Sequence, residues 1–280
     1  MCGRLGRKML RRAFLAGAPL AAQIASPEEP FRIGPRAPFP GSPVLFSFAE
    51  KVEAGQWMGR TVTFGLDASS KRWVGLAAVG LETKPGVHVL DLGEGRSHKV
   101  RVAPHLYRTG KLTVAPKFVT PPKSVSERIA REQAIKKKVF AARSERLWVG
   151  AFGAPTDTSQ SSPFGTRRTY NGKTQSTHQG LDFRAVVGTS VRAAARGRVL
   201  IAEEMYYEGG FVVLDHGEGL FTLYMHLSKF LAPVGETVEK GAVLAESGSS
   251  GRVTGPHLHF GVQWQGLYME PGTLLALKIA

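Results

Sequence analysis

The chain has 280 residues and one cysteine, and its 37 Lys and Arg against 22 Asp and Glu give a formal net charge of +15. The length favours two domains, and a single cysteine, Cys2, excludes an intramolecular disulfide. A basic chain could bind nucleic acid, but no basic patch interleaved with aromatic residues and no recognition motif is present. We therefore expect no nucleic-acid partner and a charge that attracts the protein to an anionic polymer.

The first 25 residues have the pattern of a secretory signal. Residues 1–12 carry five basic side chains and no acidic one, and residues 13–25 are apolar and too short to span a membrane comfortably. Arg11-Arg12 is similar to the pair in a twin-arginine signal, although the usual Ser or Thr before it is missing. We expect residues 1–25 to be a signal peptide that directs export to the periplasm or cell envelope. The alternative is an uncleaved anchor in the inner membrane.

Residues 30–116 have the pattern of an all-β domain of the sandwich or barrel kind. Short runs of strand-forming residues are separated by Gly, Pro and Asp. The region contains no cluster of catalytic residues, so it could position the rest of the chain, bind a partner, cover part of a groove or act as a spacer. The expected strands are 42–48, 60–64, 73–79, 87–90, 99–102 and 111–114.

Residues 117–147 are predicted to form a helical linker. Pro121-Pro122 ends the β region, and Ser124 and Glu127 have the spacing of a capping box. Apolar residues at roughly helical spacing extend the expected helix over 125–146. The lysines at 136–138 are expected on its solvated face.

Five residues in the last third of the chain have the side chains of a metal-dependent hydrolase. Imidazole nitrogen and carboxylate oxygen are ligands that zinc accepts, and a catalytic zinc ion needs three protein ligands and an open position for water. Five candidates would supply three ligands and leave two imidazoles for chemistry. The five are His178, Asp182, His226, His257 and His259.

The spacing of these residues predicts that they meet. His257 and His259 are two apart in a strand-like run, so both imidazoles should project from one face. His178 and Asp182 flank Gly180, which fits a turn entering a strand. His226 lies in another strand-like run, 221–227, in which the two-residue period places Tyr224 on the same face as His226.

Competing interpretations fail on spacing. The sequence contains no H-E-x-x-H and no G-x-S-x-G near these residues. The glycine-rich stretch 248–255 lacks the G-K-[ST] ending of a phosphate loop and is expected to be a turn that leads to His257. The other motif-like residues are expected to be structural or on the surface: Asp215 and His216 in a hairpin turn, and His88, His98 and His105 in the β domain.

Residues 148–271 resemble the lysostaphin-type (LytM-like) zinc metallopeptidases, which are bacterial peptidoglycan endopeptidases. The resemblance implies a C-terminal antiparallel β-sheet domain, 148–280, with an open groove. The chain is therefore expected to be mainly β, and the N-terminal β domain is similar to the one that precedes the peptidase in many Gram-negative relatives. The motifs are F-G-T-R-R at 164–168, H-Q-G-L-D-F at 178–183, T-L-Y-M-H-L-S at 222–228 and G-S-S-G-R-V-T-G-P-H-L-H-F at 248–260.

The resemblance also assigns roles to the five residues. It implies that His178, Asp182 and His259 bind one Zn²⁺ per chain and that His226 and His257 are catalytic. Zinc lowers the pKa of a bound water to about 7, and a nearby imidazole can take its proton and pass it to the leaving amine. We expect His257 to be that base, with His226 orienting the water or donating to the oxyanion.

The groove is expected between two polar segments, 164–177 and 206–210. Arg167, Arg168 and Tyr224 are the candidates for contact with substrate. The expected function is that of a zinc-dependent endopeptidase that hydrolyses the D-alanyl to diaminopimelate cross-links of peptidoglycan. The alternatives are a non-catalytic or latent envelope protein that binds the cell wall and regulates another hydrolase, or a structural protein in which zinc only stabilises the fold.

Overall fold

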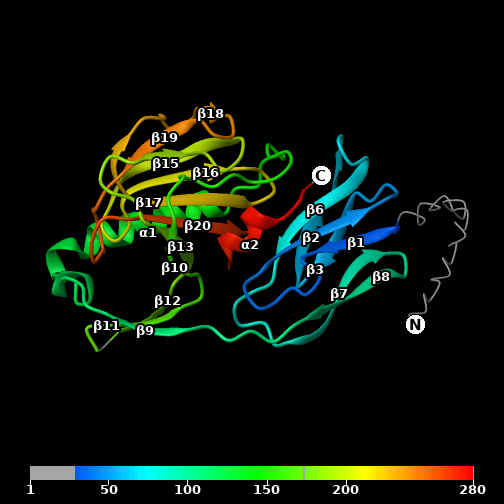
Figure 1. Ribbon diagram of the computed structural model, residues 1–280, viewed down its shortest axis with the longest axis horizontal. Helices are drawn as coiled ribbons and strands as arrows, with labels where there is room; N and C mark the ends of the chain where they lie inside the picture. The colour runs from blue at the N-terminus through cyan, green and yellow to red at the C-terminus, as the bar shows by residue number, and fades with distance from the viewer. Residues whose placement is uncertain (1–28, 173, 280) are drawn as a thin grey trace, which may run out of the picture.

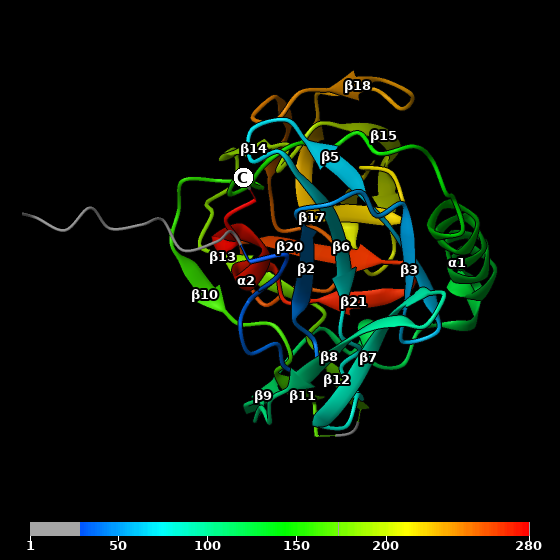
Figure 2. The ribbon, with the colours of Figure 1, turned by 90° about the vertical axis from the view of Figure 1, so that its right-hand side faces the viewer.

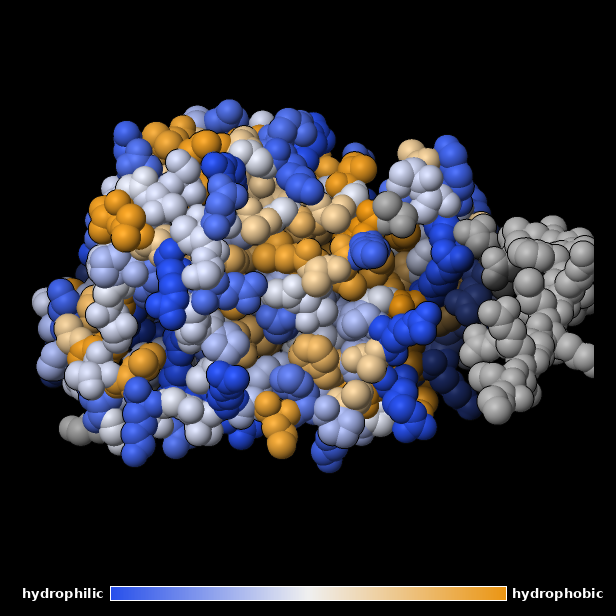
Figure 3. All heavy atoms as spheres, viewed as in Figure 1, coloured by the Kyte–Doolittle hydropathy of each residue, from blue (hydrophilic) through white to orange (hydrophobic). Residues whose placement is uncertain are grey.

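Two β-rich domains lie side by side in a computed structural model that describes residues 29–172 and 174–279 (Figure 1). The predicted signal, with Cys2, lies outside the described residues. Within the described part of the chain, no helix is both long and apolar enough to cross a membrane. On the face shown in Figure 3, hydrophilic side chains are spread among apolar ones, as expected if most of the charge is solvated.

The N-terminal domain is a sandwich of two four-stranded antiparallel sheets, ordered β1-β2-β6-β5 and β4-β3-β7-β8. Their inner faces are joined by ring contacts such as Phe46 against Trp57, and the Trp57 indole donates to the Ala78 carbonyl. Alternate residues of β3 are buried, because only one face of its sheet is covered. The strands are β1 (Phe31–Gly34), β2 (Pro43–Phe48), β3 (Ala54–Trp57), β4 (Arg60–Thr63), β5 (Gly65–Asp67), β6 (Arg72–Ala78), β7 (Gly86–Gly93) and β8 (Arg96–Val102).

The C-terminal domain is built on a ten-stranded sheet whose main path is β10-β13-β20-β17-β16-β15-β18. The neighbouring pairs on this path are antiparallel, which confirms the predicted mainly β fold class. Its strands are β10 (Gln160–Ser162), β13 (Gly180–Phe183), β14 (Ser190–Arg192), β15 (Gly197–Met205), β16 (Gly209–Asp215), β17 (Leu220–Phe230), β18 (Thr237–Val238), β19 (Val243–Ser247), β20 (Leu258–Trp264) and β21 (Leu267–Met269).

The central strands β16 and β20 are buried on both faces along almost their whole length. One face carries Tyr224 and Phe260 in the main core. The other face is partly covered by α1 (Ser126–Phe140), where Phe140 packs edge-on against Phe221. Figure 2 shows α1 at the right-hand edge of the molecule. The chain ends near α2 (Pro271–Ala276), which Glu270 caps through the backbone N–H groups of residues 272 and 273.

The linker helix is shorter than the sequence predicted. A 3-10 turn, Lys123–Val125, precedes α1, and no described side chain caps its first turn, so the predicted capping box of Ser124 and Glu127 is not formed. Beyond Phe140 the chain leaves the helix because its polar groups find partners on the β16–β17 turn. The Ser144 hydroxyl bonds Asp215, and Leu147 N–H donates to the His216 carbonyl. Helix geometry therefore ends before residues 141–147.

The strand predicted at 111–114 does not join the N-terminal sheets. The segment β9 (Thr109–Leu112) pairs in parallel with β11 (Arg167–Tyr170), which also pairs with β12 (Thr174–Thr177). The amide side chain of Asn171 bonds both the N–H and the carbonyl of Val114. A 3-10 turn, Pro116–Phe118, follows. The chain thus crosses between the domains and adds a strand beside the β11–β12 hairpin (Figure 1).

Several hydrogen bonds fix the position of the two domains. Arg146 donates to the carbonyls of Val74 and Thr63 in the sandwich and pairs with Glu218 in the C-terminal domain. The Gln265 side-chain amide donates to the Thr61 carbonyl, and Arg60 donates to the Gln265 carbonyl. Since the main apolar core includes residues of both domains, the groove described below lies on a continuous, packed support.

Candidate active site

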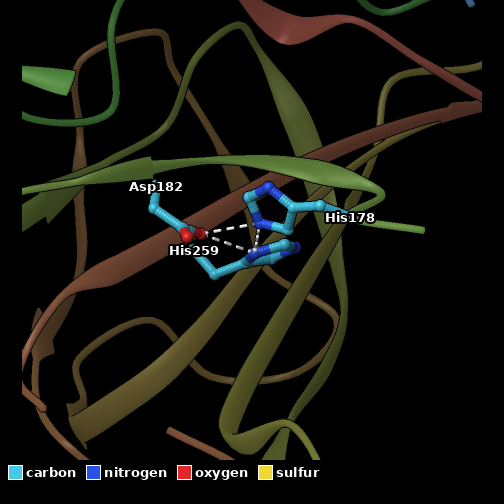
Figure 4. Close-up of side chains that lie close together, drawn as sticks. All are labelled: His178, Asp182 and His259. Carbon is cyan, nitrogen blue, oxygen red and sulfur yellow. Dashed lines mark hydrogen bonds and ion pairs between the residues drawn. The ribbon is translucent and has the colours of Figure 1, made fainter. Parts of the chain in front are cut away.

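Three side chains converge on one point. Asp182 on β13 and His259 on β20 are directly paired in the antiparallel register, and His178 lies two residues before the start of β13. The Asp182 Oδ1 atom lies 2.9 Å from both His178 Nε2 and His259 Nδ1, and the two nitrogens are 3.0 Å apart. Figure 4 shows the three groups pointing toward one another. All three are buried or nearly so.

This triangle of atoms fits a metal ion. His178 Nδ1 lies 2.8 Å from the Pro163 carbonyl, which can only accept, so Nδ1 carries the proton and Nε2 offers a lone pair. Three ligands at 2.0–2.1 Å from a tetrahedral ion would lie roughly 3.3 Å apart, close to the separations observed here. A shared cation is the group that suits three electron-rich atoms at such distances.

Gly180 makes the close approach possible. A Cβ atom at this position would lie 2.4 Å from His259 Nε2 and 2.6 Å from the Phe260 carbonyl. The sequence pattern placed Gly180 at a turn entering a strand, and the structure has it as the first residue of β13. Its small size, which lets the His259 ring lie against the strand, is therefore the property that the site uses.

Arg168 on β11 holds the other oxygen of the Asp182 carboxylate. Its Nη2 atom lies 3.0 Å from Asp182 Oδ2 and 2.7 Å from Ser162 Oγ. Burial opposes ionisation of Asp182, but hydrogen bonds with His178 and His259 outweigh it and hold the pKa of the carboxyl well below its ordinary value. Burial lowers the pKa of His178 in turn. The site therefore favours an ionised Asp182 carboxylate beside a neutral His178 imidazole, which is the state in which these two groups bind a metal.

The two remaining histidines, His226 and His257, lie beside the triangle with ring centroids 4.8 Å apart. His226 Nδ1 is 2.9 Å from the Ser250 carbonyl, and His257 Nδ1 is 2.8 Å from the Gly255 carbonyl. Both Nδ1 atoms therefore donate, and each Nε2 retains a lone pair. His257 Nε2 lies 3.9 Å from the metal-facing Asp182 Oδ1. Two uncommitted bases thus flank the candidate metal position.

The environments of these two imidazoles differ. His226 is only 6% exposed, and burial together with the nearby His257 and His259 holds its pKa well below its ordinary value. The His257 side chain is 20% exposed and borders the groove. His226 is consequently suited to remain neutral, whereas His257 is more accessible to a reacting group.

A β-bulge places His226 in the site. In the β16–β17 register, Met225 and His226 together oppose Phe211, so β17 contains one extra residue. His226 takes a positive φ of 67° at this point. The prediction that Tyr224 shares its face was wrong because the bulge interrupts the two-residue alternation. Tyr224 points into the core, where its hydroxyl accepts a hydrogen bond from Ala194 N–H.

A groove of about 510 Å³ runs past Asp182, His226, His257 and His259. A smaller hollow of about 170 Å³ shares Arg168, Tyr170 and Arg252 with it, so the depression continues across the metal position. Both expected walls take part. The segment 164–177 forms the β11–β12 hairpin, and Tyr207 and Glu208 come from the turn between β15 and β16. The interdomain strand adds an apolar rim that the sequence did not predict, through Leu112 and Val114.

Only one of the three candidate substrate-contact residues borders the groove. Arg168 lines the groove, whereas neither Arg167 nor Tyr224 is among the described residues that border it. Arg167 lies on the opposite face of β11 and is exposed, and its N–H donates to the Arg108 carbonyl. Sequence reasoning missed Tyr170, Arg184 and Arg252. Of these, only Tyr170 had a clear signal, since it follows Arg168 by two residues on one strand.

The other histidines have the structural surroundings that were expected. His216 is fully buried, with Nδ1 donating to the Arg196 carbonyl and Nε2 2.7 Å from Thr222 Oγ1. In the N-terminal domain, His98 stacks on Phe31, His105 stacks on Phe39 and His88 bonds the Lys84 carbonyl.

The fold and the His/Asp/His group define a metallopeptidase domain. Residues 176–271 match the model of peptidase family M23. A solved structure of a peptidase M23 from Pseudomonas aeruginosa is 27% identical, with a TM-score of 0.67, and the match covers 85% of this chain and 95% of that one. The likeness extends over both domains.

Curated relatives match only the C-terminal part. The peptidoglycan DD-endopeptidase ShyA of Vibrio cholerae is 43% identical over 83 residues, 30% of this chain and 19% of ShyA. The DD-carboxypeptidase/endopeptidase Mpg of Neisseria meningitidis is 40% identical over 111 residues, 40% of this chain and 26% of Mpg. The chain thus matches about a quarter or less of the length of these relatives.

Proposed function

We propose that this protein is a zinc-dependent endopeptidase that hydrolyses peptide cross-links in peptidoglycan. The observation that carries the proposal is the meeting of the His178, Asp182 and His259 ligand atoms with the two free bases of His226 and His257. Relatives that share this part of the chain are named peptidoglycan DD-endopeptidases. The natural bond is then the one from D-alanine to the D-centre of diaminopimelate in a neighbouring stem peptide.

The ligand set favours zinc, because imidazole nitrogens and one carboxylate oxygen in a three-ligand site are typical of catalytic zinc. When bound, the ion would supply Lewis acidity and make water acidic enough to ionise near neutral pH. His178, just before β13, and His259 on β20 would hold it together with Asp182, and Arg168 would keep the Asp182 carboxylate turned toward it through the 3.0 Å contact to Oδ2.

The two remaining imidazoles move the protons. His257 Nε2 accepts a proton from the attacking water and then gives it to the nitrogen of the leaving amine. The Gly255 carbonyl supports this exchange because it fixes the ring through Nδ1. His226, kept neutral by burial, orients the water through Nε2, and its own Nδ1 stays bonded to the Ser250 carbonyl.

The groove suits an extended, acidic peptide. It passes across the site, and three arginines border its larger part: Arg168, Arg184 and Arg252. The formal charge is +15 for the whole chain and +10 without the five basic residues of segment 1–25, and this charge would draw the protein toward the anionic wall polymer. Peptidoglycan as substrate places the protein in the cell envelope, consistent with the export that residues 1–25 predict.

Digestion of purified sacculi tests the proposal. Residues 26–280, loaded with zinc, should convert cross-linked muropeptide dimers to monomers, with new D-alanine carboxyl and diaminopimelate amino termini in mass spectra. His257→Ala and a chelated sample serve as controls. Bound zinc without any cleavage would reject the enzyme and favour a wall-binding regulator of another hydrolase.

A further inference from the structure

The groove contains arginine charge that the metal site does not use. Arg168 is committed to Asp182, the only acidic side chain among the described residues that line the larger part of the groove. Glu208, in the smaller hollow, is paired with Lys136. Arg252 borders both parts of the groove, and among residues 29–172 and 174–279 it has no carboxylate partner. An anionic group of the substrate could therefore pair with the Arg252 guanidinium.

Arg252 is held in place by aromatic rings from both walls. Its guanidinium carbon lies 4.8 Å from the centroid of the Tyr170 ring and 5.2 Å from that of Tyr207. Its backbone N–H donates to the Tyr207 carbonyl at 2.9 Å. Contacts with ring faces position the guanidinium but use none of its N–H donors, which remain available for a planar anion. Arg252 is thus a pre-organised carboxylate-binding group.

The distribution of charge in the substrate identifies that carboxylate. In a D-alanyl to diaminopimelate cross-link, the alanine side contributes a methyl group next to the scissile carbonyl. The carbon bonded to the scissile nitrogen carries a free carboxylate, which is the nearest anion to the reacting bond. Arg252 borders the same hollow as His226 and His259, so it lies beside that bond when the carbonyl faces the metal position.

We propose that Arg252 determines specificity by binding the carboxylate on the carbon that bears the leaving nitrogen. The inference rests on the proposed peptidoglycan endopeptidase function and deepens it. It predicts a preference for free diaminopimelate over amidated diaminopimelate. Lysine, which has no carboxylate at that carbon, would be a poor acceptor residue for the same reason. Arg252 acts in binding, while the proton transfers remain with the histidines.

The test compares two purified muropeptide dimers that differ only in amidation of that carboxylate. Wild-type protein should cleave the free form with a kcat/KM about 10- to 100-fold higher, as expected for a charge-assisted, bidentate pair. Arg252→Gln should reduce kcat/KM on the free form by a similar factor and leave the amidated form nearly unchanged. Arg252→Lys should retain part of the preference, since it keeps the charge without the planar fork.

The amidated dimer separates a binding role from a structural one. Arg252 belongs to the loop whose carbonyls at Ser250 and Gly255 hold the two catalytic histidines, so a displaced loop would slow both substrates equally. An equal loss on both dimers, or equal wild-type rates on both, would overturn the inference. Failure of the wild type on both would instead reject the proposed function. Arg196→Gln, a surface arginine paired with Glu239, is the matched control and should behave as wild type.

Discussion

Arg168 and Asp182 form an ion pair in which the carboxylate is divided between two tasks. Oδ2 accepts a hydrogen bond from Arg168 Nη2 at 3.0 Å, while Oδ1 lies 2.9 Å from both His178 Nε2 and His259 Nδ1. The arginine comes from the β11–β12 hairpin and the aspartate from the main sheet. One wall of the groove is thereby connected directly to the carboxylate that we propose as a metal ligand.

Removal of this pair should weaken metal binding without unfolding the domain. Arg168→Gln frees the carboxylate to rotate, and loss of such an outer partner typically costs 10- to 100-fold in metal affinity. Competition with a chromophoric chelator would measure the zinc affinity. Arg167→Gln is the matched control, because this neighbouring side chain lies on the other face of the strand and should leave the affinity unchanged. Equal affinities for both variants would show that the pair has no role in binding.

Zinc content and cleavage rate, measured together, should distinguish a metal ligand from the general base. His178→Ala removes a ligand and should lose zinc, whereas His257→Ala should retain one zinc per chain. The rate of the second variant should fall about 10²- to 10⁴-fold, the usual contribution of a positioned acid–base group. Elemental analysis and muropeptide cleavage measure the two quantities. Loss of zinc from His257→Ala would place this residue among the ligands instead.

Chelation should abolish cleavage but leave the fold intact. The strands that carry the site have an extensive core on their other face, including the fully buried Tyr224 and Phe260. Zinc removal should therefore lower Tm only by the amount that ligand binding contributes. Circular dichroism with and without chelator would record this. Cooperative unfolding at room temperature on chelation would identify a structural ion.

His216 should make the stability depend on pH. Burial lowers its pKa to about 4 in the folded chain, against an ordinary value near 6.5. Between these values the unfolded chain binds more protons, so the free energy of unfolding falls as pH is lowered through this window. Between pH 7.5 and pH 5, the part of the free energy of unfolding that depends on His216 falls by about 2 kcal/mol.

Urea denaturation at pH 7.5 and pH 5.0, with chelator present, tests this contribution. His216→Gln should be less stable at pH 7.5 because it loses the contacts to Arg196 and Thr222, but its loss between the two pH values should be smaller than that of wild type. The other buried histidines titrate in both proteins, so their effect cancels in the comparison. An unchanged pH dependence would contradict the assignment.

The fold class and the meeting of the five side chains could be predicted because they depend on local patterns. His257 and His259 are two apart on β20, and strand geometry directs both to one face. The family resemblance added an antiparallel sheet and the grouping of His178, Asp182 and His259. Asp182 and His259 then came together through the antiparallel register of β13 and β20.

The remaining features depend on contacts that no local pattern records. The bulge at Met225 and His226 is set by pairing with β16, so alternation placed Tyr224 on the wrong face. The parallel pairing of β9 with β11 joins distant parts of the chain. The end of α1 depends on partners that residues 144–147 find on the β16–β17 turn. Arg252 gave no signal because its tyrosine contacts come from two other segments.

The most direct measurement of the central proposal is mass spectrometry of muropeptides after digestion of purified sacculi with the zinc-loaded chain, residues 26–280. The five-residue site predicts that cross-linked dimers disappear, that monomers with a free diaminopimelate amino group appear, and that chelation or His257→Ala prevents both changes. Unchanged dimers in the presence of stoichiometric zinc would contradict the endopeptidase assignment.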